Sequence, residues 1–160
     1  MSRTKEQEWG DNPRLNTWRA AQQAAFETWA EETGGIWDFT PDSVDRLEEA
    51  MRGRYFTWDE VSEAEDGPFL SLASWYLGEV QVRTYGAIWQ WCPTPAQPPN
   101  PWDKPFVTLP AASAGEGEQR EELYEDEDYV PGCTPISEIR SLFARGPEHR
   151  LRDVLKQYAS

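Results

Sequence analysis

Hydrophobic residues between Gly67 and Cys92 follow two periods in succession. After Gly67-Pro68, where proline at the first helical position already has a helical φ, apolar residues recur every three or four positions and share one helix face: Phe69, Leu72, Ala73, Tyr76, Leu77 and Val80. Gly86 stands where a left-handed residue would end the helix. Side chains then alternate from residue 87 to 92, as in a strand. The sequence therefore predicts a core helix over 68–85 that leads directly into a strand.

One glycine within this helix predicts a close contact. Glycine costs about 1 kcal/mol relative to alanine in a helix interior. A close helix–strand or helix–helix approach at Gly78 is the expected compensation. The neighbouring Glu79 is the one acid that stands out as a candidate for acid/base chemistry; because Arg83 lies four residues further on, the favoured interpretation is an exposed ion pair.

Apolar residues at helical spacing predict four more helices. With their cap residues, these cover residues 15–32, 42–52, 135–146 and 147–158. Residues 36–40 read as a short connector or strand, and residues 55–61 as a short helix or an irregular aromatic segment. The helix over 42–52 is expected to bury Val44, Leu47 and Met51 and to leave three acids in solvent: Asp45, Glu48 and Glu49.

Strand signals are short and few. Residues 106–109 are expected to pair antiparallel with residues 87–92, and residues 123–130 are a candidate third, edge strand. Six prolines among residues 93–105 predict a semi-rigid surface loop, and residues 110–122 an acidic, glycine-containing linker. Residues 1–13 lack periodicity and are expected to be a flexible N-terminus, although Trp9 could pin them to the body. The prediction is one α+β domain over 14–160, with helices packed on a small antiparallel sheet of two to four strands.

The balance of charge is strongly acidic and uneven. The net charge is −14; residues 93–134 carry nine acidic and two basic side chains, whereas residues 135–160 carry three and five. Such a field repels nucleic acid and anionic membranes and favours a basic protein partner. Nine tryptophans, six tyrosines and six phenylalanines indicate an aromatic core.

Segments for export or membrane insertion are not predicted, because no run of 18 apolar residues occurs and the first residues are polar. We therefore expect a cytoplasmic protein in which Cys92 and Cys133 are free thiols. Neither cysteine has a CxxC partner, and the sole histidine, His149, is distant from both in sequence, so no metal site is predicted.

Motifs for catalysis are also missing. The sequence has no GxGxxG, GxxxxGK[ST] or HExxH, and no serine stands in a glycine-flanked elbow. We predict no cofactor and no enzymatic activity. An active site made only of carboxylates would leave no motif, so an enzyme remains a third hypothesis.

Two segments are candidates for contact with a partner. In the proline-rich loop, Trp102 beside Asp103 could anchor a partner or stack on a sugar ring, or could fold back to pin its own loop. The acidic run, Glu125, Asp126, Glu127 and Asp128, could belong to a docking surface, could be a solvated edge that prevents strand aggregation, or could hold a cation weakly.

The segment SLASWYLGEVQVRTYGAIWQW, over residues 71–91, resembles the helix-to-strand signature of small bacterial proteins, some of which are grouped with the immunity proteins of polymorphic toxin systems. The TPDSVDRLEEAM and VPGCTPISEI segments add weaker similarity, and the proline-rich loop and the EDED run depart from the pattern. The resemblance implies a binding protein and brings no catalytic residues.

Two hypotheses of function follow. The first is a non-enzymatic cytoplasmic protein that binds a basic partner, such as a toxin domain, through the acids of residues 116–128 and the Trp102 loop. The alternative is a small-ligand or glycan-binding module that uses exposed tryptophans.

Overall fold

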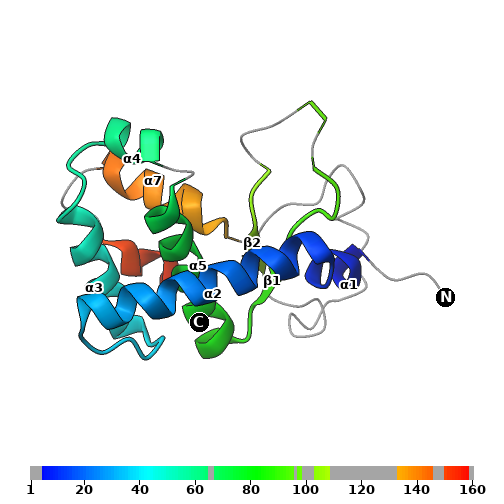
Figure 1. Ribbon diagram of the computed structural model, residues 1–160, viewed down its shortest axis with the longest axis horizontal. Coiled ribbons are helices and arrows are strands. Elements are labelled where there is room, and N and C mark those ends of the chain that lie inside the picture. Colours follow the sequence, from blue (N-terminus) through cyan, green and yellow to red (C-terminus); the bar gives the residue numbers. More distant parts are fainter. Residues whose placement is uncertain are drawn as a thin grey trace.

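The computed structural model describes residues 5–64, 67–95, 97–98, 103–108, 133–145 and 150–158. Its elements, in chain order, are α1 (Lys5–Gly10), α2 (Pro13–Thr33), α3 (Pro41–Arg52), α4 (Trp58–Ala64), α5 (Pro68–Tyr85), β1 (Ile88–Gln90), β2 (Phe106–Thr108), α7 (Pro135–Arg145) and the 3₁₀ helix η1 (Leu151–Tyr158). In Figure 1, α2 crosses the front of the molecule, with the two strands near its beginning and α3 near its end. The predicted α+β class is confirmed.

Helix α5 is the centre of the fold. It begins after Gly67 and ends at Gly86, whose positive φ of 77° forms the left-handed cap, so both predicted ends are confirmed. Every residue from Leu72 to Gln81 is buried. The helix packs against α2, α3, α7 and both strands. It is therefore covered on all sides rather than along the single face that the apolar spacing indicated.

The expected close approach at Gly78 is a contact between α5 and β1. A Cβ atom at Gly78 would lie within 3.0 Å of two ring atoms of Trp89 and 3.1 Å from a third. The indole of Trp89 is 3% exposed and lies directly against the helix backbone. Glycine at this position is what lets the strand approach the helix so closely.

The sheet has two antiparallel strands among the described residues. Trp89 pairs with Val107, Ile88 with Thr108 and Gln90 with Phe106. On the other side of β2, Val107 exchanges two backbone hydrogen bonds with Cys133, each 2.8 Å long. The predicted pairing of 106–109 with 87–92 is confirmed, whereas the candidate strand over residues 123–130 lies outside the described residues.

Residues 5–13 differ from the flexible tail expected for residues 1–13, and Trp9 attaches them to the body of the protein. Residues 5–10 form α1, and the Trp9 carbonyl accepts a hydrogen bond of 3.0 Å from the Trp91 N–H at the edge of the sheet. The Trp9 ring packs edge-on against Phe106, with 6.0 Å between centroids. Asn12 is buried and caps α2 through a 3.0 Å bond from the Leu15 N–H. Aromatic packing of Trp9 and the cap formed by Asn12 therefore give a defined structure to a segment whose sequence has no hydrophobic periodicity.

An aromatic cluster joins α2, α5 and the segment before α3. The Tyr76 hydroxyl donates to Ser43 Oγ at 2.7 Å and accepts from the Phe39 N–H at 3.0 Å. The Phe39 ring stacks on Tyr76 with 4.6 Å between centroids, which stabilises the positive φ of 60° at Phe39. Burial raises the pKa of the Tyr76 hydroxyl above its ordinary value, so its proton is retained.

The C-terminal helices close the other side of the core. Helix α7 begins at Pro135 as expected and packs on α4 and α5, and η1 packs on α3. The last predicted helix is present as the 3₁₀ helix η1, which begins at Leu151; its expected start at Gly146-Pro147 lies outside the described residues. None of the helices in the described part of the chain has both the length and the apolar character that a membrane crossing requires.

Candidate interaction surface

Most of the predicted partner-binding residues fall outside the part of the chain that the structure describes. These are Trp102 and the acidic run, Glu125, Asp126, Glu127 and Asp128. Asp103 is described, and its carboxylate accepts two hydrogen bonds from the Arg14 guanidinium, at 2.8 and 3.1 Å, and one of 3.0 Å from Trp91 Nε1. Asp103 therefore fixes the end of the proline-rich loop to α2 and to Trp91, the residue after β1, while contact with a partner remains a prediction.

Glu79, expected in an exposed pair, is buried. Its side chain is 6% exposed, and its two oxygens accept hydrogen bonds from Trp89 Nε1 at 2.7 Å and from Arg83 Nε at 3.1 Å. Arg19 lies 3.6 Å away on α2. The prediction of an exposed pair was wrong because α5 has no solvent-facing side at this point.

Glu48 is the second buried acid, and its expected exposure was also wrong. Its side chain is 2% exposed and pairs with Arg52 at 2.7 Å and with Arg150 at 3.5 Å. It also accepts a hydrogen bond of 2.8 Å from the Leu151 N–H. The carboxylate thus caps the start of η1, which explains why it lies inside.

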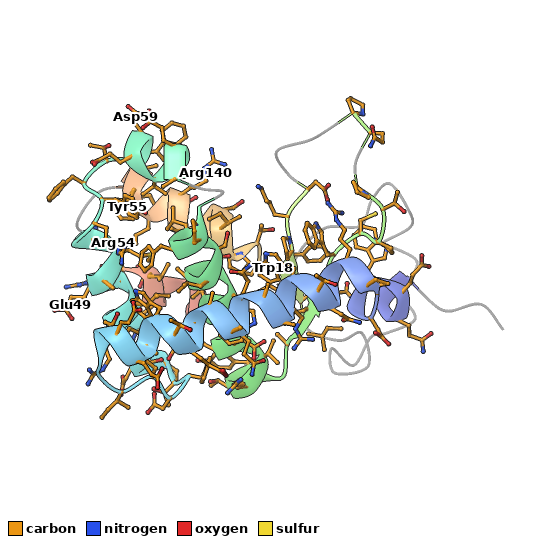
Figure 2. All side chains as sticks on the ribbon, viewed as in Figure 1. Trp18, Glu49, Arg54, Tyr55, Asp59 and Arg140 are labelled. Atoms are coloured by element: carbon orange, nitrogen blue, oxygen red, sulfur yellow. The ribbon has the colours of Figure 1, made fainter. Side chains whose placement is uncertain are left out.

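Two aromatic side chains stand out on the surface between α3 and α4. Phe56 is 82% exposed and Trp58 is 40% exposed. The beginning of α4 adds three exposed acids, Asp59, Glu60 and Glu63. We call these five residues the α4 corner. Figure 2 shows Asp59 at the outer end of α4, with Glu49 and Arg54 further along the same edge of the molecule.

Hydrogen bonds hold the α4 corner in a defined shape. The Glu60 N–H donates to Thr57 Oγ1 at 3.2 Å, and Glu60 Oε1 accepts from the N–H groups of Phe56 and Thr57 at 3.0 and 3.2 Å. This reciprocal arrangement is a capping box. The residue before such a cap commonly packs against the residue four positions into the helix. Val61 is buried at that position, yet Phe56 points into solvent.

The base of the α4 corner is packed on the body. Tyr55 lies between Phe69 of α5 and Phe143 of α7, with centroid distances of 6.3 and 6.4 Å. The guanidinium of Arg140 lies 5.4 Å from the Trp58 ring centroid, a cation–π contact. The exposed rings therefore stand on a fixed platform.

Sequence reasoning did not single out Phe56 and Trp58. The run Tyr55–Val61 was expected as a short helix or an irregular aromatic segment, and the helix is present from Trp58. The signal in the sequence was the capping box Thr57-x-x-Glu60. That signal places the helix start but would have predicted a buried Phe56.

Two hollows in the described part of the chain are lined by tryptophans. A cleft of about 600 Å³ lies between α1, α2, α5 and β1, and a smaller pocket of about 170 Å³ lies beside Trp18 and Trp91. In the smaller pocket the Trp91 ring is already covered by the Arg14 guanidinium at 3.8 Å. No group of three or more His, Cys, Asp or Glu side chains in the described ranges could hold a metal ion.

A scan against protein-family models, a search of curated proteins and a search of solved structures each found no match to this chain. The geometry of the α4 corner and the charge of the chain are therefore the features that point to a function.

Proposed function

We propose that this protein is a non-enzymatic cytoplasmic binding protein that holds a basic protein partner, in the manner of an immunity protein that inhibits a toxin domain. The observation that carries the proposal is Phe56, an aromatic side chain that is 82% exposed on a hydrogen-bonded turn beside the acids of α4. Two free cysteines, one of them buried, agree with a reducing compartment.

Phe56 has the properties of an anchor residue. Burial of a phenylalanine side chain contributes about 1.5–3 kcal/mol, and this contribution is left unused in the isolated chain. The capping box fixes the backbone on both sides of the ring, so little backbone freedom would be lost on binding. Aromatic anchors of this kind supply much of the affinity in protein interfaces.

The charge around Phe56 selects the partner. Residues 52–66 contain five acids against two arginines, Arg52 and Arg54, and the whole chain has a net charge of −14. Such a field attracts a basic surface over the Debye length of about 8 Å at physiological ionic strength. Charge would therefore speed the encounter, and burial of Phe56 would slow release.

A photocrosslinking experiment in the native host tests this proposal. A photoreactive phenylalanine analogue replaces Phe56 in one variant and Ile36 in a control, because Ile36 is also apolar and is 62% exposed. We expect one basic protein, encoded near this gene, to crosslink at position 56 and not at position 36. The double variant Asp59→Lys, Glu63→Lys should lower the yield at least tenfold, and added salt should lower it too.

Two results would contradict the proposal. One is equal crosslinking at positions 56 and 36, which indicates random contact. The other is a specific adduct with an acidic or neutral protein whose yield does not respond to salt or to the charge-reversed acids.

The acidic run is tested separately. Replacing Glu125, Asp126, Glu127 and Asp128 with serine leaves Phe56 and α4 unchanged. If the run belongs to the same docking surface, the association rate with the crosslinked partner should fall while the dissociation rate changes little. An unchanged association rate would restrict the contact to the α4 corner.

A further inference from the structure

The cleft between α1, α2, α5 and β1 has the size of a small-molecule site. Its volume is about 600 Å³, and ligand pockets commonly measure about 300–1,000 Å³. Its lining combines the apolar residues Val82, Ala87, Ile88 and Trp89 with the polar residues Arg19, Asp11 and Gln7. The cleft and the α4 corner share no residue. Binding of a ligand in the cleft would therefore be independent of binding of the proposed protein partner.

Arg19 is the cation of this cleft, and its donors are unused. The side chain is 40% exposed and forms no hydrogen bond within the described residues, and its Nε atom is buried without a partner. Its ion pair with Glu79, at 3.6 Å between Nη2 and Oε2, is longer than a hydrogen bond. An acceptor in the cleft would satisfy the end of the guanidinium.

The carboxylate of Glu79 has hydrogen-bond donors and a balancing charge without Arg19. Both carboxylate oxygens already accept a hydrogen bond, one from Trp89 Nε1 at 2.7 Å and one from Arg83 Nε at 3.1 Å. Arg83 also balances the charge of Glu79. Glu79, Arg83 and Arg19 together carry one excess positive charge, and Asp11 in the lining of the cleft supplies one negative charge beside it.

A backbone donor lies on the same side of β1. Because Val107 exchanges its backbone hydrogen bonds with Cys133, Trp89 opposite it belongs to a pair without hydrogen bonds across the two strands. The Trp89 N–H therefore points away from β2 and forms no hydrogen bond in the described part of the chain. Trp89 lines the cleft, so this N–H and Arg19 are donors on one cavity.

We propose that the cleft binds a small organic monocarboxylate. Its carboxylate accepts from the Arg19 guanidinium and the Trp89 N–H, and its apolar part lies on Val82 and Ile88. Asp11 on the rim disfavours a second negative charge. The expected ligand therefore has one carboxylate and a short apolar group.

NMR titration of the full chain tests the site with phenylacetate, hexanoate and N-acetyl-leucine as probes. Phenylacetamide is the matched control, since it keeps the shape of phenylacetate without its charge. We expect saturable binding of at least one acid, a downfield shift of the Trp89 backbone amide, and at least tenfold weaker binding of phenylacetamide and of succinate.

Three variants assign the binding to this cleft. Arg19→Gln should weaken binding of the acid at least tenfold, whereas Arg46→Gln, which removes an exposed cation on α3, should not. Because Arg19→Gln also removes a neighbour of Glu79, Gly10→Val provides a second route: its side chain would grow into the cleft from the wall. The proposal is overturned if none of the three acids binds, if phenylacetamide binds equally well, or if both cleft variants bind like the unmodified chain.

Discussion

Replacing Gly78 with alanine tests the closest contact in the core. An exposed helix would gain about 1 kcal/mol from Gly→Ala. Here the added methyl group would fall within 3.0 Å of Trp89 Cζ2 and Cη2. The indole cannot retreat freely, because it is hydrogen-bonded to Glu79 at 2.7 Å and packed edge-on against Trp18 at a centroid distance of 5.2 Å.

The expected size of the effect follows from these two opposing terms. Overpacking of a tight core costs about 1–3 kcal/mol, and sometimes more. Two ring atoms are overlapped and the ring is fixed on both sides, so we place the cost at the upper end. After the helix gain of about 1 kcal/mol is subtracted, Gly78→Ala should lower the free energy of unfolding by about 2 kcal/mol. Urea denaturation followed by circular dichroism at 222 nm measures it.

Two comparisons decide the interpretation. Gly53→Ala is the matched control, since a methyl group there makes only ordinary contacts of 3.5 and 3.6 Å with backbone oxygens; its effect should be within about 0.5 kcal/mol. In a Trp89→Leu background, Gly78→Ala should cost at least 1 kcal/mol less than in the unmodified chain, on the scale of contact couplings of about 0.5–3 kcal/mol. If Gly78→Ala is as stable as the unmodified chain, or if its cost is unchanged without the indole, the reasoning is refuted.

Three further substitutions test the buried polar groups. Tyr76→Phe removes the hydroxyl that joins Ser43 and Phe39 and should cost about 2 kcal/mol in urea denaturation; an unchanged midpoint would contradict it. Glu48→Ala removes the oxygen that accepts from the Leu151 N–H, so it should cost about 3 kcal/mol and speed hydrogen exchange at the Leu151 amide; equal exchange would refute the capping role. Burial raises the pKa of the Glu138 carboxyl above 4.5, so its charged form opposes folding increasingly as pH rises through that range. Glu138→Gln should therefore be more stable than the unmodified chain at pH 7, with the difference vanishing below pH 4.5.

Local signals in the sequence were sufficient to predict where the main helices begin and end. Thr40 with Pro41, Gly67 with Pro68, and Gly86 each combine a cap with a backbone preference that few alternatives satisfy. The strand pairing followed from two short apolar runs around one loop. Gly78 predicted the helix–strand contact because a glycine in a helix interior needs a packing reason.

The buried acids could not be predicted from such signals. Glu48 with Arg52 and Glu79 with Arg83 have the spacing of ordinary surface pairs. What buries them are groups remote in sequence, Leu151 in one case and Trp89 in the other. Helix periodicity reports one apolar face, and it does not reveal that a helix is covered on every side.

The two candidate sites, the α4 corner and the cleft, could not be predicted from sequence periodicity either. Exposed Phe56 has no feature in the sequence that separates it from the aromatic residues of the core. The cleft at β1 depends on the strand alternation at Val107 and on the placement of Arg19, which periodicity does not give. Trp102 and the acidic run remain predictions.

Arg14 holds both ends of the proline-rich loop. Its guanidinium donates to the Cys92 carbonyl at 2.9 Å and to the Asp103 carboxylate at 2.8 Å. Because the two ends are joined at one side chain, the fold does not depend on how many residues lie between them, and each doubling of a loop's length costs only about 0.6 kcal/mol. The loop is therefore a site where evolution or an engineer can exchange whole sequences, such as a tag or a new recognition segment, while the core stays unchanged.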